Sequence, residues 1–538
     1  MKERLVEDWL TRINERGYQT AFGQSLLSRG FSVLRISHSP YEHGKDVLAV
    51  SADGEVHCYQ LKDGDIGIKE WERDYGQTCA LVETRPSHPA LPSKYNYRPF
   101  VVTTGAFSDP VLDRISQHNL AWESRAHPKL TPVNGKELQR EFTALSADFW
   151  PVEPPDVRAF RALYLVDGRG DFAADQFDQF MRTLLGGEFS PRELDRRTAA
   201  ANVFASCLLG EYYRQEDHWS VFRGWMLCAS RVAWAGERHS RPDGRRRKSF
   251  ALAKEAAVAA LGALAKECTE PKAFLPPRLE LDEYTCLRNT TALGAWAAFC
   301  LLEEDHSSNS SLSDLCAAQC EKFIADDLLW FWGESAVPTL LSIVWLLEKK
   351  GKPETGRKLL LDFTDCLVTS QQPDSTEPLP DPYISGDGAL KLALEDRIAQ
   401  KEKRPMSVQS HALLPLVLLM VNRKLRKELE AIWSRLSRVR ITFFAPAHPW
   451  GYLEWRCAEG TERDAMFNQP QSWADLVKSA KSPKVDLLPE ALRTDMQFAL
   501  MFLLAAPHRL AWSVIGSLDQ QLSKASVSVG SQNRGEMS

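Results

Sequence analysis

The chain has 538 residues, 44% of them hydrophobic, and a formal net charge of −5. A chain of this length exceeds what a single hydrophobic core usually supports, so we expect two or more domains. The slightly acidic balance excludes a protein that is basic over its whole surface. Any contact with nucleic acid must therefore use a local basic patch.

The cysteines and the apolar runs bear on the cellular compartment. The eleven cysteines include no CxxC pair, which favours reduced, buried thiols over zinc sites or disulfides. The segment at 1–19 is charged and amphipathic, unlike a signal peptide. The longest apolar runs, at 412–421 and 498–506, are much shorter than the ~20 residues that cross a bilayer. We therefore expect a cytoplasmic protein without membrane contact.

The first elements in chain order are helices followed by strands. Apolar residues spaced by three or four predict one or two amphipathic helices that end at Gly17 and Gly30. Three β-type runs follow, at 31–37, 46–51 and 55–62. The last two runs are separated by Ala-Asp-Gly, which is a strong signal for a β-hairpin.

Helices and a further strand complete this part of the chain. We predict a helix at 68–84, a buried strand at 99–104 and a helix from 109 to 118. This order predicts an α/β domain at 1–145, with a mixed central sheet flanked by helices.

The sequence changes character at a proline cluster, 151–155, which cannot continue a helix. Beyond it, stretches rich in Leu, Ala and Trp have helical spacing and predict a large all-α C-terminal region. A proline-rich stretch at 371–388 is predicted to be a loop or linker. We expect helical domains at 156–370 and 387–526 and a disordered tail at 527–538. An α-solenoid remains open, because no fixed repeat is evident.

The third β-type run carries residues suited to phosphodiester chemistry. Side chains alternate along a strand, so Cys58, Gln60 and Lys62 share one face. Asp46 begins the neighbouring strand of the hairpin. We therefore expect a carboxylate, an amide and an ammonium group near one end of the sheet.

These groups match the needs of a hard divalent cation, which prefers carboxylate and carbonyl oxygens. Asp46 would anchor Mg²⁺, and Gln60 would add its side-chain oxygen and Leu61 its backbone carbonyl. Lys62 would orient or deprotonate the attacking water and offset charge that develops on the phosphate.

Two short motifs contain these residues. Gly44-Lys45-Asp46 and Gln60-Leu61-Lys62 resemble the GxD and QxK elements of the Mrr-like branch of the PD-(D/E)xK nucleases, in which glutamine commonly replaces the acidic residue. LLSRGF before the first strand, VVTTGAFS at 101–108 and VNGKELQ at 133–139 resemble flanking elements of the same branch.

The resemblance covers about residues 15–145. It implies a restriction-endonuclease-like fold with Asp46, Gln60 and Lys62 as catalytic residues. It also implies Mg²⁺, with Mn²⁺ as a substitute, bound by Asp46 and Gln60.

Members of this branch often carry a glutamate on the first helix. Glu7, Glu15 and Gln24 are the candidates here, and the alternative for each is a solvated helix face or a helix cap. Asp63 and Asp65 follow Lys62 directly and are predicted to form a turn.

Two basic segments lie in the helical region. The first, 238–248, has six Arg or Lys residues in eleven and is predicted to be a loop. Its run Arg245, Arg246, Arg247 and Lys248 would suit contact with nucleic-acid phosphates, and the alternative is a mobile solvated loop. The second, 423–440, has a helical apolar stripe and is interpreted as an ordinary amphipathic helix.

Together these features predict a Mg²⁺-dependent DNA endonuclease whose helical region senses, recruits or oligomerises. The resemblance implies a bacterial restriction or anti-phage role. No phosphate-binding Walker motif is present, so sensing or ATPase activity would need a protein partner. Cleavage of two strands favours a homodimer or larger oligomer. The alternatives are an inactive nuclease-fold scaffold or DNA-binding protein, and a nuclease that acts on RNA.

Overall fold

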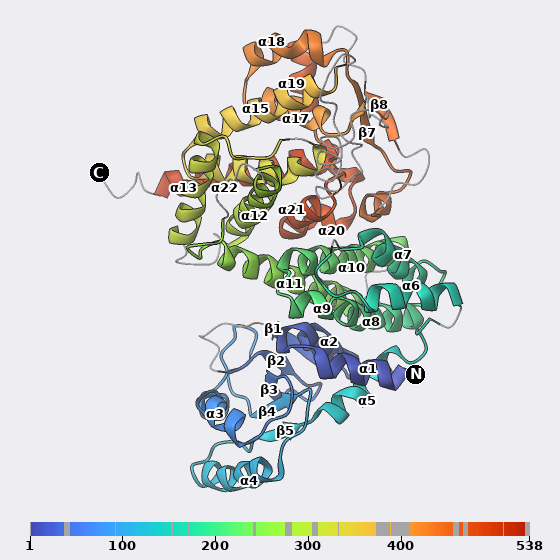
Figure 1. Cartoon of the computed structure of the whole chain (residues 1–538), viewed down its shortest axis with the longest axis vertical. Coiled ribbons are helices and arrows are strands. Elements are labelled where there is room, and N and C mark those ends of the chain that lie inside the picture. Colours follow the sequence, from blue (N-terminus) through green and yellow to red (C-terminus); the bar gives the residue numbers. More distant parts are fainter. Residues whose placement is uncertain are drawn as a thin grey trace. The chain divides into compact units, whose positions relative to one another are not determined.

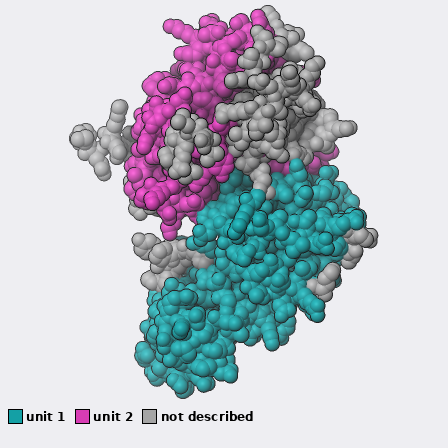
Figure 2. Space-filling view, in the orientation of Figure 1, with its two compact units in different colours: residues 1–260 teal, residues 261–538 magenta. Residues whose placement is uncertain are grey.

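The computed structural model describes residues 2–36, 44–91, 93–151, 154–170, 172–239, 244–274, 282–303, 310–331, 333–372, 388, 409–455, 462–465, 472–508 and 510–532. The chain divides into two compact units, Met1–Ala260 and Leu261–Ser538, which Figure 2 shows in teal and magenta. The first unit therefore contains the sheet together with several helices that follow it in sequence. The domain boundaries expected near 145, 156, 370 and 387 stay predictions.

The N-terminal part of the first unit is a five-stranded mixed sheet with helices around it (Figure 1). Its strands are β1 (Ser32–Ile36), β2 (Val47–Val50), β3 (Val56–Lys62), β4 (Tyr97–Thr103) and β5 (Thr131–Val133). They lie in sequence order; β1, β2 and β3 are antiparallel, whereas β3, β4 and β5 are parallel. The predicted mixed sheet is confirmed.

The hairpin between β2 and β3 forms where the Asp-Gly signal placed it. Gly54 has φ +86°, a backbone conformation that side chains other than glycine rarely adopt. The hairpin pairs Val47 with Tyr59, so Asp46 lies beside the end of β3 that carries Gln60 and Lys62.

The helices around the sheet are α1 (Lys2–Arg12), α2 (Glu15–Ser28), α3 (Ile68–Glu83), α4 (Asp109–Ser124) and α5 (Gly135–Ser146). The predicted helix end at Gly17 is wrong, because Gly17 lies inside α2. Its backbone N–H donates to the Asn14 side chain, which caps α2 at the N-terminus. Helix α4 continues past the predicted end at His118, and Trp122 in this extension is buried in the core.

Two helices cover one face of the sheet with a continuous apolar core. Trp71 and Leu81 of α3 and Val111 of α4 pack there against Leu48 and Cys58 of the sheet. Cys58, Gln60 and Lys62 are every second residue of β3, so they share one face of the sheet. Because Cys58 packs on the side of α3, Gln60 and Lys62 also lie on that side. Helix α2 contacts β1, β2 and β3 through other residues, including a ring contact between Phe22 and Tyr59.

The remaining helices of the first unit follow the sheet in the chain. They are α6 (Pro154–Tyr164), α7 (Ala174–Leu185), α8 (Pro191–Leu208), α9 (Gly210–Arg214), α10 (His218–Arg238) and the first part of α11 (Gly244–Glu267). Helix α8 packs against both α2 and α5. The buried Asn202 amide of α8 donates to Gln24 Oε1 of α2 over 2.8 Å.

The second unit is mainly helical. Its helices include α12 (Asp282–Glu303), α13 (Ser310–Ala325), α14 (Val337–Lys349), α15 (Pro353–Ser370), α17 (Leu413–Asn422), α18 (Arg426–Leu436), α19 (Trp473–Lys481), α20 (Glu490–Thr494), α21 (Met496–Ala505) and α22 (Trp512–Gln532). Short 3₁₀ helices lie at Glu334–Ala336, Pro449–Leu453 and Val485–Leu487.

The expectation of an all-α region is wrong in one respect, because the second unit has a three-stranded sheet. Its strands are β6 (Gln409–Ser410), β7 (Arg440–Phe444) and β8 (Glu462–Ala465), and β7 lies in the middle. The sequence of β7, RITFF, combines β-branched and aromatic residues, which suit a strand.

Other expectations for this half have mixed outcomes. The proline-rich stretch at 371–388 falls, apart from Gln371, Gln372 and Gly388, outside the described residues. Helix α22 extends to Gln532, past the predicted start of a disordered tail at 527. The cysteines in the described ranges form no disulfide. Among the helices described, none combines the length and the apolar character that spanning a membrane requires.

Candidate active site

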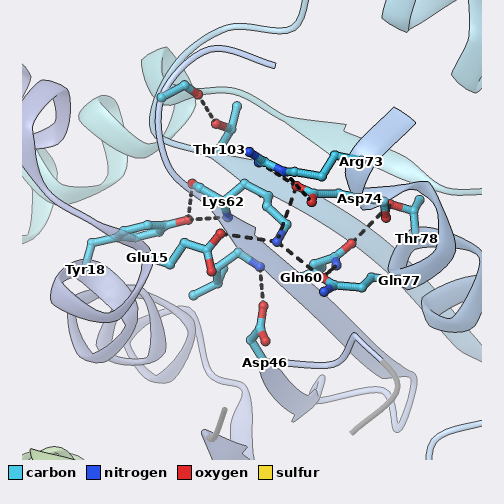
Figure 3. A network of polar contacts seen from close by, with 12 residues as sticks. Glu15, Tyr18, Asp46, Gln60, Lys62, Arg73, Asp74, Gln77, Thr78 and Thr103 are labelled. Atoms are coloured by element: carbon cyan, nitrogen blue, oxygen red, sulfur yellow. Dashed lines mark hydrogen bonds and ion pairs between the residues drawn. The ribbon is translucent and has the colours of Figure 1, made fainter. Parts of the chain in front are cut away.

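The end of β3 brings Gln60 and Lys62 together, as their shared face predicted (Figure 3). Gln60 is only 1% exposed, and its Nε2 donates to Gln77 Oε1 over 3.0 Å. The same oxygen lies 3.4 Å from Lys62 Nζ. Gln77 belongs to α3, so one side chain of that helix contacts both residues of the QxK motif.

Asp46 lies immediately before β2 and is fixed through its main chain and its carboxylate. Its backbone N–H donates to the Tyr59 carbonyl over 2.9 Å. Its carboxylate Oδ2 accepts the Leu61 backbone N–H over 2.7 Å. The carboxylate therefore contacts the main chain of β3 between Gln60 and Lys62. The structure thus brings the GxD and QxK motifs to the same end of the sheet.

Lys62 has acidic side chains from two helices around its ammonium group. Nζ lies 3.2 Å from Glu15 Oε1 of α2 and 3.7 Å from Asp74 Oδ2 of α3. The Lys62 side chain is 13% exposed. A mostly buried ammonium group between two carboxylates satisfies the general requirement that buried charges be paired.

Of the three candidates for a first-helix acid, the structure brings Glu15 to this site. Glu15 is the first residue of α2 and contacts Lys62 directly. Glu7 is exposed on α1. Gln24 contacts Asn202 of α8 instead.

The two carboxylates beside Lys62 have opposite pKa shifts. Burial raises the pKa of Glu15, and the nearby charge of Lys62 offsets only part of this effect. Burial also acts to raise the pKa of Asp74, but the hydrogen bond from Arg73 and the charge of Lys62 outweigh it and lower the pKa overall. Ionised Glu15 is thus held at an energetic cost, whereas ionised Asp74 is favoured.

Sequence reasoning missed the contribution of α3, namely Asp74, Gln77 and Thr78. Thr78 Oγ1 lies 3.3 Å from Gln60 Oε1, which adds a second α3 contact to the buried amide. Gln77 and Thr78 lie three and four residues after Asp74, so the three side chains project from one side of the helix. A polar face on a helix packed against the QxK strand is the signal that would have identified them.

The site offers few side-chain oxygens to a hard cation, so water would have to complete the coordination. No group of three or more His, Cys, Asp or Glu side chains arranged to hold a metal occurs in the ranges that the structure describes. The side-chain oxygens that the two motifs offer are the Asp46 carboxylate, which accepts the Leu61 N–H, and the Gln60 amide oxygen, which lies beside the Thr78 hydroxyl; main-chain carbonyls are further donors. Such a set fits Mg²⁺, which accepts few protein ligands and retains water.

Asp63 and Asp65 lie in the connection between β3 and α3, as the turn prediction stated. Gly64 between them has φ +67°, which a tight turn favours. Asp65 Oδ1 accepts the Ala106 N–H over 2.8 Å. Asp65 therefore stabilises the neighbouring loop.

The first basic segment differs from the predicted loop. Residues 244–248 begin helix α11, while 240–243 fall outside the described residues. Arg246 is 5% exposed and its Nε lies 3.0 Å from Asp195 Oδ1, so it is a structural residue. Arg245, Arg247 and Lys248 are exposed, and Lys248 Nζ contacts Ser32 Oγ over 3.3 Å. The helical period explains this difference, because consecutive residues of a helix point in different directions and Arg246 is the one that faces Asp195.

The second basic segment is an amphipathic helix only over Arg426–Leu436, and the predicted helix over 423–440 is wrong at its ends because Arg440 already begins β7. In α18, Leu429, Ile432 and Leu436 are buried. Arg423 precedes this helix and is buried between Glu348 and Asp519, with closest N–O distances of 2.6 and 2.9 Å. This arginine holds helices together within the second unit.

Comparisons with known proteins identify no relative. No family model matches the chain, nor does any curated protein or solved structure.

Proposed function

We propose that this protein is a Mg²⁺-dependent endonuclease of the PD-(D/E)xK type that hydrolyses phosphodiester bonds in DNA. One observation supports the proposal most strongly. The Asp46 carboxylate, the Gln60 amide and the Lys62 ammonium group lie at one end of β3, between α2 and α3 (Figure 3). The motif resemblance and the mixed sheet agree with this assignment.

Each residue has a distinct role in the proposed reaction. Asp46 and the oxygen of Gln60 would hold the cation, with the Leu61 carbonyl as a further donor. When bound, Mg²⁺ would supply Lewis-acid chemistry, polarising a phosphoryl oxygen and lowering the pKa of water. Lys62 supplies positive charge for the phosphate and orients the attacking water. Glu15 and Asp74 hold the Lys62 ammonium group in place.

The wider setting belongs to the same proposal. We assign the protein to bacterial restriction or anti-phage defence, with the helical region as the sensing and oligomerising part. The packing of α8 on α2 supports a link between that region and the site. A dimer would supply the two active sites that cleavage of both strands requires, and a protein partner would supply any ATPase step.

A plasmid assay tests the activity. Wild-type protein with Mg²⁺ should nick or linearise supercoiled plasmid, and Lys62→Ala should lower the rate about 100-fold or more. Lys136→Ala is the matched control, because Lys136 is an exposed lysine of α5 in the same unit. Equal rates for wild type and Lys62→Ala would contradict the proposal. Cleavage of RNA but not DNA would replace DNA with RNA as substrate.

A second candidate is a nuclease-fold protein that binds DNA or partners without cutting. It is favoured by the lack of a three-carboxylate metal group among the described residues. Calorimetric titration with Mg²⁺ or Mn²⁺ separates the two. The endonuclease should show metal binding that Asp46→Ala abolishes, whereas the scaffold should show none.

A further inference from the structure

The amide of Gln60 has two ends, and only its oxygen can bind a cation. An amide NH₂ group is a donor and repels a metal ion, so a flipped Gln60 would block the site that its oxygen serves. A carboxylate at this position would present oxygen in either orientation. Where glutamine replaces the acid, a neighbouring residue must therefore fix the orientation of the amide.

The hydrogen bonds around Gln60 fix its orientation, starting from the Lys62 ammonium group. The ammonium group is only a donor, so the Gln77 atom 3.4 Å from Lys62 Nζ must be the acceptor Oε1. That oxygen lies 3.0 Å from the Gln60 amide, so the Gln60 atom facing it must be the donor Nε2. The other end of the Gln60 amide is therefore Oε1.

Thr78 does not determine this orientation by itself. Its hydroxyl lies 3.3 Å from Gln60 Oε1, but a hydroxyl can donate to an oxygen or accept from an NH₂ group. Gln77 is thus the residue that distinguishes the two orientations, and Lys62 in turn fixes Gln77.

The position of Gln77 is supported by the main chain around it. Gly44 of the GxD motif has φ +72°, and an added Cβ there would lie 2.6 Å from the Gln77 carbonyl oxygen. The loop that carries Asp46 thus packs directly on the turn of α3 that carries Gln77. Lys45 Nζ donates to the Ala80 carbonyl of the same helix over 3.1 Å.

We infer that Gln77 is a positioning residue that holds the Gln60 amide with its oxygen directed to a divalent cation. Gln77 belongs to neither motif. This inference rests on the proposed metal-dependent function, and it explains how a site with glutamine in place of the usual acid retains a defined oxygen ligand. Gln77 itself touches neither metal nor substrate.

Direct metal binding provides the test. Purified full-length protein is titrated with Mn²⁺, and free Mn²⁺ is measured by electron paramagnetic resonance. Gln77→Leu removes the acceptor and should weaken Mn²⁺ binding about 10-fold, as loss of outer contacts to metal ligands commonly does. Gln77→Glu keeps an acceptor oxygen and should restore binding. Because Gln77 is exposed, both variants should keep the wild-type Tm.

A double substitution separates orientation from every other effect of Gln77. In the Gln60→Glu background both ends of the side chain are oxygens, so Gln77→Leu should change Mn²⁺ affinity by no more than about twofold. The Lys62 contact is lost equally in both backgrounds. A loss of the same size in both would overturn the inference, since it would show that Gln77 acts through Lys62 or the fold.

The outcomes also separate this inference from the proposed function. If wild-type protein binds Mn²⁺ and cleaves DNA while Gln77→Leu binds as well as wild type, only the role of Gln77 is refuted. If wild-type protein neither binds Mn²⁺ nor cleaves DNA, the proposed function fails and the inference fails with it.

Discussion

The phenol of Tyr18 forms two hydrogen bonds with the main chain of Lys62. Its Oη donates to the Lys62 carbonyl over 2.9 Å and accepts the Lys62 N–H over 3.2 Å (Figure 3). Burial raises the pKa of Tyr18 well above its usual value, so the phenol stays protonated and keeps both roles. Tyr18 lies three residues after Glu15 on α2, and this helix therefore contacts both the main chain and the side chain of Lys62.

Replacing Tyr18 with phenylalanine should destabilise the protein and lower activity. The change leaves the Lys62 N–H without its observed acceptor, which should cost about 1–3 kcal/mol of unfolding free energy. Denaturant unfolding measures the loss. Tyr75→Phe is a control, because Tyr75 contacts His118 away from Lys62, and this variant should retain activity. A Tyr18→Phe protein with wild-type stability and activity would contradict a positioning role.

Glu15→Gln should make the protein more stable and less active at neutral pH. The pKa of folded Glu15 is raised above 4.5, so the favourable neutral form is present below that pH and is lost as pH rises through the folded pKa. The glutamine variant does not ionise, and its Tm advantage over wild type should therefore grow between pH 4 and pH 7. Thermal melts across this range provide the measurement.

The same variant should lose plasmid cleavage by roughly 10-fold, because Lys62 loses a charged partner. A Tm advantage that shrinks as pH rises would contradict the pKa argument. An unchanged cleavage rate would show that Glu15 has no role in the proposed activity.

Gly44→Ala should be more harmful than Gly54→Ala. Both glycines have positive φ, at +72° and +86°, so both substitutions incur backbone strain of about 1–2 kcal/mol. Only at Gly44 does the new Cβ meet the Gln77 carbonyl, whereas nothing lies within 4 Å of it at Gly54. Urea unfolding compares the two variants. Equal losses of unfolding free energy would show that the close approach to α3 is unimportant.

Adjacent arginines of α11 should behave differently. Arg246→Met breaks a buried ion pair with Asp195 and should cost about 3 kcal/mol of unfolding free energy. Arg247→Ala changes an exposed residue, so stability should stay within about 0.5 kcal/mol. If the exposed basic residues bind DNA, Arg247→Ala should also lower the slope of log affinity against log salt by about 1. An unchanged slope would exclude this residue from DNA contact.

The sequence predicted the parts of the site that depend on local rules. Strand alternation placed Gln60 and Lys62 on one face, and the Asp-Gly hairpin brought Asp46 beside them. The helix boundary at Asn14 was harder to predict. Glycine at position 17 suggests the end of a helix, whereas asparagine at position 14 suggests the start of one. Reading Asn14 as a cap would have placed Glu15 at the start of α2.

Other parts depend on packing between distant segments, which local patterns do not determine. Gln77 reaches Gln60 only because α3 packs on β3 with a particular rotation. Arg246 is buried because α8 presents Asp195 opposite it, although its sequence neighbours are all basic. The sequence of β7 alone could also continue the preceding helix. Its pairing with β6 and β8, which lie far from it or in a separate segment, is what makes it a strand.

Helix α2 connects the surroundings of Lys62 to α8 through the contact between Gln24 and Asn202, so binding at one end can be thermodynamically linked to binding at the other. The same helix contacts Lys62 at one end and, through this buried 2.8 Å hydrogen bond, α8 further along. If a ligand on the α8 side favours one position of α2 and thereby changes affinity for substrate, substrate must change affinity for that ligand by the same factor. Saturating the proposed nuclease site with DNA is therefore a way to detect a ligand of the helical region.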